Sequence, residues 1–151
     1  MKRNEHIVPL SRDHHFGLLL CWKIRQGVKR NIPPARIQKY VCHFWDTQLH
    51  THFEEEETFL FSQVNDKLCD RAFDEHKEIE ARIAAIRDHP SVEALLALAG
   101  CIDGHIRFEE RELFPFLESR IPAEKLAVIG QQLEHSHSVP PADHYGDEFW
   151  A

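Results

Sequence analysis

Apolar residues recur every three or four positions along most of the chain, which is the period of an amphipathic α-helix. This pattern predicts helices over residues 11–29, 34–63, 66–88, 91–120 and 122–134. Ser11 and Ser91 are suitable N-caps for the first and fourth of these helices. Pro33 and Pro90 mark the breaks that precede the second and fourth helices.

The predicted fold class is all-α, because no stretch shows the alternation and turn signals of paired strands. Four long helices with short connections favour an antiparallel up-down four-helix bundle, with the short fifth helix after it. We assign residues 1–134 to this bundle domain and residues 135–151 to a His- and Pro-rich tail that we expect to be flexible. The sequence does not decide whether Phe149 and Trp150 hold the end of the tail against the bundle.

Composition and charge exclude several classes of function. A net charge of −7 over 151 residues lacks the basic surface of a nucleic-acid binder. No apolar run approaches the roughly 20 residues that span a bilayer, and residues 1–10 lack the apolar core of a signal peptide. We therefore expect a cytoplasmic protein with neither nucleic acid nor membrane as a partner. The four cysteines are widely spaced, which argues against a Cys-ligated zinc or iron–sulfur site.

Each long helix carries polar residues on its apolar stripe. These residues are His14, His52, Glu56, His76, His105 and Glu109. A buried carboxylate costs several kcal/mol unless it is paired or binds a metal. The spacing His-x-x-x-Glu occurs in the second and fourth helices, and it places both side chains on one face, one turn apart. Imidazoles and carboxylates together form a typical metal-ligand set, so the sequence predicts a metal site between the helices.

The chain also contains an internal repeat. The segment from His52 to Phe61 aligns with the segment from His105 to Phe114, and a His, two Glu, a Leu and a Phe coincide. Asp13-His14 and Glu75-His76 form a weaker second pair. Two helices thus present the same ligand pair, and glutamates so placed can bridge two metals roughly 3.5 to 4 Å apart.

These motifs resemble the hemerythrin-like (HHE cation-binding) family over about residues 10 to 118. The segments that carry the resemblance, beside the ordered His and Glu pattern, are Ser11–His15, Asp74–Glu78 and Glu109–Pro115. The resemblance implies a four-helix bundle with a non-haem, usually di-iron, centre. It also implies that Glu56 and Glu109 bridge the metals and that the four histidines are terminal ligands. We therefore expect two iron ions, also bridged by an oxo or hydroxo oxygen.

One departure from the oxygen-carrying hemerythrins bears on function. They have His-x-x-x-His on the third helix, whereas this chain has His76-Lys-Glu-Ile-Glu80. Either the fifth position is open to water or substrate, or Glu80 fills it, and both alternatives argue against simple reversible oxygen carriage. The ligand set looks more like that of bacterial relatives linked to oxygen sensing, to nitric oxide or peroxide responses and to iron handling. We expect the protein to bind, sense or reduce such a small molecule; whether it is an enzyme stays open.

Some ligand assignments have alternatives. His50 has the same spacing to Glu54 as His52 has to Glu56, but it lies on a polar helix face. His15 is the alternative to His14, and it can instead line a channel. The remaining glutamates of the two repeated segments are expected to be solvated; they are Glu55, Glu57, Glu110 and Glu112. The tail histidines are also expected to be solvated; they are His135, His137 and His144.

Three alternative classes of protein compete with the di-iron prediction. A ferritin-like oxidase needs Glu-x-x-His on two helices, and the only such pair is Glu134 with His137 in the tail. A zinc or single-metal structural bundle needs fewer ligands than the six inward residues supply. A non-catalytic metal sensor cannot be separated from an enzyme by sequence. A Gly-x-Ser-x-Gly motif and a Gly-rich phosphate loop are both absent, which argues against a serine-nucleophile enzyme and gives a dinucleotide-binding fold little support.

Overall fold

The computed structural model describes residues 2–136 and 145–151, and every regular element in that part of the chain is helical. Four rods form the body. The first rod is α1 (Val8–Lys29) and the third is α4 (Lys67–Asp88). The second rod consists of α2 (Pro34–Phe44), η2 (Trp45–Leu49), α3 (His50–Glu55), η3 (Glu56–Leu60) and η4 (Phe61–Gln63). The fourth rod consists of α5 (Val92–Phe108), η5 (Glu109–Leu113) and α6 (Phe114–Arg120).

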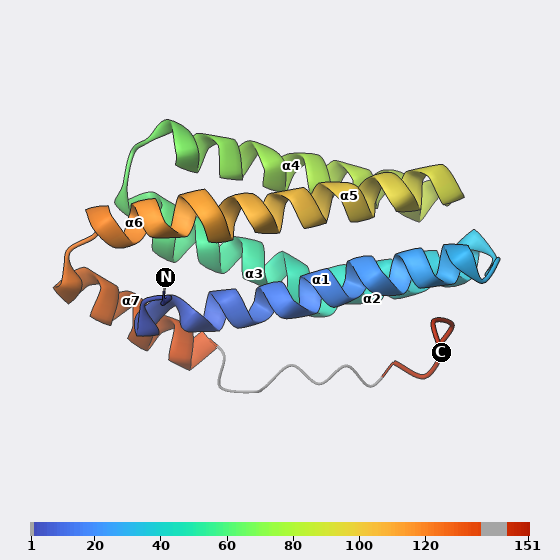
Figure 1. Cartoon of the computed structure of the whole chain (residues 1–151), viewed down its shortest axis with the longest axis horizontal. Coiled ribbons are helices and arrows are strands. Elements are labelled where there is room, and N and C mark those ends of the chain that lie inside the picture. The colour runs from blue at the N-terminus through green and yellow to red at the C-terminus, as the bar shows by residue number, and fades with distance from the viewer. Residues whose placement is uncertain (1, 137–144) are drawn as a thin grey trace.

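The four rods run alternately up and down (Figure 1). Contacts join α1 to α2, α2 to α4, α4 to α5 and α5 back to α1, which closes the ring of an antiparallel four-helix bundle. The predicted all-α bundle is therefore confirmed. The predicted extra helix is α7 (Ala123–Ser136), which packs against η1 (Glu5–Ile7) at the end of the bundle where the chain begins.

Side-chain caps fix two of the helix starts near their predicted positions. Ser91 accepts a hydrogen bond from the Ala94 N–H at 3.1 Å, as expected of an N-cap. Asp66 caps α4 in the same way through the Leu68 N–H, at 2.9 Å.

The predicted start of the first helix at Ser11 is wrong by one turn. The helix α1 begins at Val8, and Pro9 stands in its first turn, where a missing N–H costs nothing. Ile7 and Leu10 are fully buried on either side of that start, so apolar contact extends the helix toward the N-terminus. Ser11 is consequently inside the helix, and its hydroxyl donates to Glu110 at 2.8 Å.

Three short π-helical segments interrupt the second and fourth rods. Two of them begin at the repeated glutamates, η3 at Glu56 and η5 at Glu109. The N–H groups of Phe61 and Phe114 bond to the carbonyls of Glu56 and Glu109, five residues back rather than four. Segments of this type occur frequently at functional sites. The sequence repeat is therefore also a repeat of an uncommon backbone geometry.

The apolar core consists of two clusters with a polar layer between them. One cluster includes Leu20 of α1 and Ile79 of α4, while the other includes Leu10 of α1 and Ala72 of α4. His14 and His76 lie between these positions on their helices and are buried. The fold therefore places polar groups in the middle of the bundle, where water does not reach them.

The end of the tail packs against the body, which is the arrangement that the sequence left open for Phe149 and Trp150. Phe149 is 3% exposed and belongs to the same core cluster as Tyr40. The Lys23 ammonium lies 3.9 Å from the Trp150 ring and donates to the Tyr40 hydroxyl at 2.9 Å. The part of the predicted flexible tail at 137–144 lies outside the described residues.

In the described part of the chain, no helix combines the length and the apolar character that crossing a membrane requires.

Candidate metal centre

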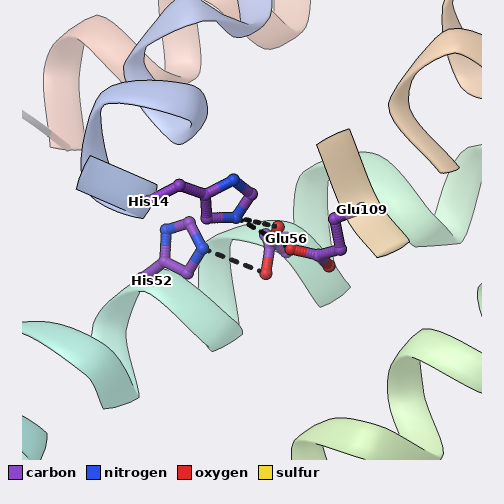
Figure 2. A group of neighbouring side chains, drawn as sticks. All are labelled: His14, His52, Glu56 and Glu109. Carbon is purple, nitrogen blue, oxygen red and sulfur yellow. Dashed lines mark hydrogen bonds and ion pairs between the residues drawn. The ribbon is translucent and has the colours of Figure 1, made fainter. Parts of the chain in front are cut away.

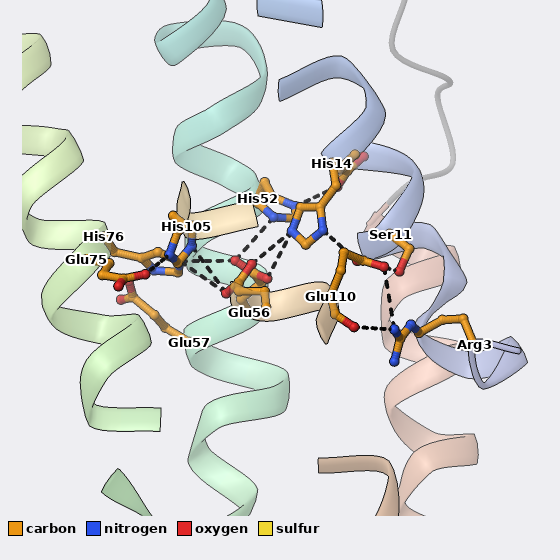
Figure 3. Close-up of polar contacts among 12 residues, drawn as sticks. Arg3, Ser11, His14, His52, Glu56, Glu57, Glu75, His76, His105 and Glu110 are labelled. Atoms are coloured by element: carbon orange, nitrogen blue, oxygen red, sulfur yellow. Dashed lines mark hydrogen bonds and ion pairs between the residues drawn. The ribbon is translucent and has the colours of Figure 1, made fainter. Parts of the chain in front are cut away.

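The six residues on the predicted inward stripes meet in the polar layer of the bundle. Each long helix or rod contributes one or two of them, and every one is at most 5% exposed. Figure 2 shows His14 and His52 pointing toward Glu56 and Glu109, and Figure 3 shows His76 and His105 on the other side of Glu56.

The donor atoms fall into two groups that share both glutamates. One group contains His14 and His52 with Glu56 and Glu109, and the other contains His76 and His105 with the same two glutamates. Within each group, one ligand atom from each residue lies within 4.8 Å of all the others. This is the arrangement that the side chains of two neighbouring cation sites with shared carboxylates would have.

The individual distances show how the glutamates span the two groups. Glu56 Oε1 lies 3.2 Å from His52 Nε2 and 3.1 Å from His76 Nε2. Glu109 Oε1 lies 2.9 Å from His14 Nε2, and its Oε2 lies 3.3 Å from His105 Nε2. Each carboxylate therefore contacts a histidine of both groups.

Every one of these four histidines is oriented through its other ring nitrogen. The Nδ1 atoms donate to four carboxylates over 2.7 to 2.9 Å, and Figure 3 shows several of these contacts. The pairs are His14–Glu110, His52–Asp13, His76–Glu57 and His105–Glu75. A carboxylate on Nδ1 fixes the tautomer and directs Nε2 to the interior, as is usual for metal-binding histidines.

Several buried atoms of the centre have no hydrogen-bond partner among the described residues. These atoms are Nε2 of His52, His76 and His105, both carboxylate oxygens of Glu56, and Oε2 of Glu109. Glu56 Oε1 lies within 3.2 Å of His52 Nε2 and His76 Nε2, and Glu109 Oε2 lies 3.3 Å from His105 Nε2, but these contacts lack hydrogen-bond geometry. Unpartnered buried polar atoms are costly, and convergence on a cation satisfies all of them at once. The residues therefore fit a metal centre.

Charge compensation within the centre shifts the acid–base equilibria of its residues. Burial lowers the pKa of His52, but the Glu56 charge and the hydrogen bond to Asp13 outweigh it and raise the pKa to about 9. Burial raises the pKa of Glu56, as does Glu109, yet the neighbouring histidines lower it to about 2. The raised pKa values of the four histidines favour protonated imidazoles in the metal-free centre, so a bound metal would have to displace protons.

The structure places the alternative residues outside the two donor groups. His50 lies on the outer face, 52% exposed, and pairs with Glu54. His15 is exposed, and its ring contacts Phe16 rather than the centre. Glu80 is 52% exposed and lies 3.9 Å from Lys77, so the structure does not place it among the converging ligands.

The sequence interpretation missed the carboxylates that orient the histidines. Glu57 and Glu110 were expected to be solvated, and that expectation is wrong because each accepts a 2.7 Å hydrogen bond from a buried histidine. A signal for these residues existed in the repeat. Asp13 and Glu75 directly precede a histidine of the centre, and Glu57 and Glu110 directly follow one of its two glutamates.

A bundle with histidines and glutamates converging from all four rods defines the class of histidine–carboxylate metal-binding bundles. Within that class, the model of the hemerythrin HHE cation binding domain matches residues 10–117, and the chain belongs to this family. Searches of curated proteins and of solved structures gave no match.

Proposed function

We propose that the chain binds two iron ions between its helices and uses them to bind, sense or reduce a small molecule. Glu56 and Glu109 would bridge the two ions. His14 and His52 would be the terminal ligands of one ion, and His76 and His105 those of the other.

The observation that carries this proposal is the sharing of both glutamates by two donor groups. A structural zinc site needs four ligands and is usually closed. Here six buried residues supply more donors than one tetrahedral ion takes, and the unpartnered atoms belong to both groups. Imidazole with carboxylate suits iron, while the absence of thiolates from the two described donor groups argues against the softer sites.

The small molecule is proposed to be O2, NO or a peroxide, and the surroundings of the centre support that size. A largely apolar cavity of about 10 Å³ borders His14, His52 and His105 and is lined by residues such as Gly17 and Ile106. A cavity of this volume holds about one water-sized molecule. When bound, the iron pair supplies redox chemistry, while the dry walls limit access to it. The cytoplasmic location expected from the sequence stays a prediction.

The test is metal content per chain on protein purified without an affinity tag, with optical spectra in air and after anaerobic reduction. Close to two irons, with near-ultraviolet charge-transfer bands that bleach on reduction, would support the proposal. One zinc per chain, or no metal even after reconstitution with iron, would overturn it and leave a structural bundle. Titration of the reduced protein with NO, O2 and hydrogen peroxide would then identify the small molecule.

A further inference from the structure

The internal repeat places two equivalent carboxylates at the centre, and their surroundings differ. Glu110 accepts from His14 Nδ1 at 2.7 Å and from the Ser11 hydroxyl at 2.8 Å. The Arg3 guanidinium lies 3.5 Å from its other oxygen and also donates to its backbone carbonyl (Figure 3). Glu110 is therefore fixed from two sides, by the first turns of the chain as well as by His14.

Glu57, the equivalent of Glu110, lacks this support. Within the described residues, His76 is the only side chain that forms a hydrogen bond or ion pair with the Glu57 carboxylate. Glu75, which orients His105, is also fixed more firmly, because Arg71 donates to it at 2.9 Å. Of these three carboxylates, Glu57 has the greatest freedom to rotate away from its histidine.

Glu57 also borders a surface pocket of about 320 Å³. The rim of this pocket carries oxygen donors from Ser62, Asn65 and Asp70, all of them exposed. Phe61 also lines the pocket and is largely buried, and its ring centroid is 5.5 Å from that of His76. Carboxylate, amide and hydroxyl oxygens suit a hydrated divalent cation. Glu57 connects these oxygens to the centre, because it lines the pocket and accepts from His76 Nδ1 at 2.7 Å.

We infer that Glu57 and its pocket form the entry route for the metal. The pocket oxygens would hold a hydrated ferrous ion, Glu57 would rotate from His76 to contact it, and His76 and Glu56 would then take it over. Because Glu57 joins the pocket to His76, the half of the centre formed by His76 and His105 would receive metal first. This inference rests on the proposed function, because it requires that the centre bind iron.

The first test blocks the pocket and measures rates. Ferrous iron is added anaerobically to metal-free protein to follow uptake, and release from the loaded protein is followed with a chromogenic ferrous chelator. Ser62→Trp places an indole at the pocket rim. Gln131→Trp is the matched control, at an exposed position on a different pocket of about 340 Å³ near the N-terminus. Iron that enters and leaves by one path is slowed equally in both directions when the path is obstructed. Ser62→Trp should therefore slow uptake and release several-fold by the same factor, while the final iron content and the iron affinity stay unchanged.

The second test uses the repeat as its own control. Glu57→Gln and Glu110→Gln each weaken the orientation of one histidine, so both should lower iron affinity by roughly 10 to 100-fold. Only Glu57→Gln should also slow uptake, because only Glu57 lies on the route. A purely orienting role for Glu57 predicts the same uptake rate for both variants, and that result would overturn the inference.

The outcomes separate this inference from the proposed function. If the parent protein loads two irons while Ser62→Trp and Gln131→Trp take up iron at the same rate, the entry route is wrong and the metal centre stands. If the parent protein takes up no iron, the proposed function fails, and the entry route fails with it.

Discussion

His50 and His52 show how little separates a buried histidine of the candidate centre from a surface histidine. Both precede a glutamate by four positions, but His52 is 5% exposed while the His50 side chain is 52% exposed. Two positions along a helix correspond to about 200° of rotation, which moves a side chain to the opposite face. The motif cannot distinguish the two histidines, because both share it. What distinguishes them is that apolar residues recur every three or four positions on the helix face of His52.

The first prediction tests this distinction. His105→Ala removes one ligand from the group that contains His76 and should lower metal content well below two ions per chain. His50→Ala removes an exposed histidine of the same motif and should leave metal content at the parent level. Elemental analysis of both variants after identical iron loading provides the measurement. Full stoichiometry in His105→Ala would contradict the assigned ligands.

The second prediction concerns an orienting carboxylate. Glu75 accepts from His105 Nδ1 at 2.7 Å, so Glu75→Gln should lower metal affinity by roughly 10 to 100-fold. Glu80→Gln changes an exposed carboxylate on the same helix and should leave the affinity unchanged. Competition with a chelator of known affinity measures both. Equal affinities for the two variants would show that Glu75 has no orienting role.

The sequence predicted the six converging residues but not the carboxylates around them, and the reason is physical. His76 interrupts an apolar stripe, and such an interruption is visible because burial of a lone polar group is costly. Glu57 and Glu110 are only 28% and 31% exposed at the side chain, yet their helix faces are mainly polar. A partly exposed glutamate needs no partner, so its pairing follows from the three-dimensional arrangement alone.

At the level of elements, the π-helical segments alter which side chains face the interior. A segment with five-residue hydrogen bonding adds one residue to a turn and rotates the positions that follow. Because η3 and η5 begin at Glu56 and Glu109, each of the two rods presents its fully buried glutamate just where this change starts. Propensity and periodicity predict regular helices there, so the rods were predicted correctly in extent while their local geometry was not.

The third prediction tests how the tail is attached to the helices. A Cβ on Gly27 would lie 2.8 Å from the Phe149 ring and 2.9 Å from Ile37, so Gly27→Ala should displace the tail and destabilise the protein by about 1 to 3 kcal/mol. Gly100→Ala has open space around the new methyl and should stabilise helix α5 by up to about 1 kcal/mol. Denaturant unfolding measures both variants.

A double-mutant cycle checks that the Gly27 effect acts through the tail. Phe149→Ala removes the ring that Gly27 accommodates, so the two substitutions together should cost less than the sum of their separate effects. Simple additivity would indicate that Gly27→Ala acts within α1 or on Ile37 instead.

At the level of the whole molecule, burying the polar layer costs free energy, and attraction between the opposite charges within the layer offsets that cost. Two fully buried glutamates are stable only with cations around them, and the metal-free protein has four histidines for that purpose. The two apolar clusters on either side keep water out, which strengthens each charge interaction in the layer. Stability of the metal-free bundle must therefore depend on pH.

The fourth prediction follows from the pKa directions. The pKa of His52 is raised from 6.5 to about 9, so its stabilising contribution is complete below pH 6.5 and is lost as the pH rises through 9. The pKa of Glu56 is lowered from 4.5 to about 2, so its contribution is complete above pH 4.5 and is lost as the pH falls toward 2. The Tm of the metal-free protein should therefore be highest between pH 4.5 and 6.5 and should fall toward pH 9.

Metal should reverse the alkaline part of this dependence. Binding requires neutral imidazoles, so metal affinity rises with pH over the range in which His52 loses its proton, and bound metal stabilises the folded state by mass action. Thermal unfolding followed by circular dichroism, with chelator and with excess metal, measures the difference between the two forms. That difference in Tm should widen from pH 6.5 to 9. As the pH rises, the histidine protons that stabilise the metal-free form and compete with the metal are lost. A constant difference across this range would mean that the buried histidines do not exchange protons for metal.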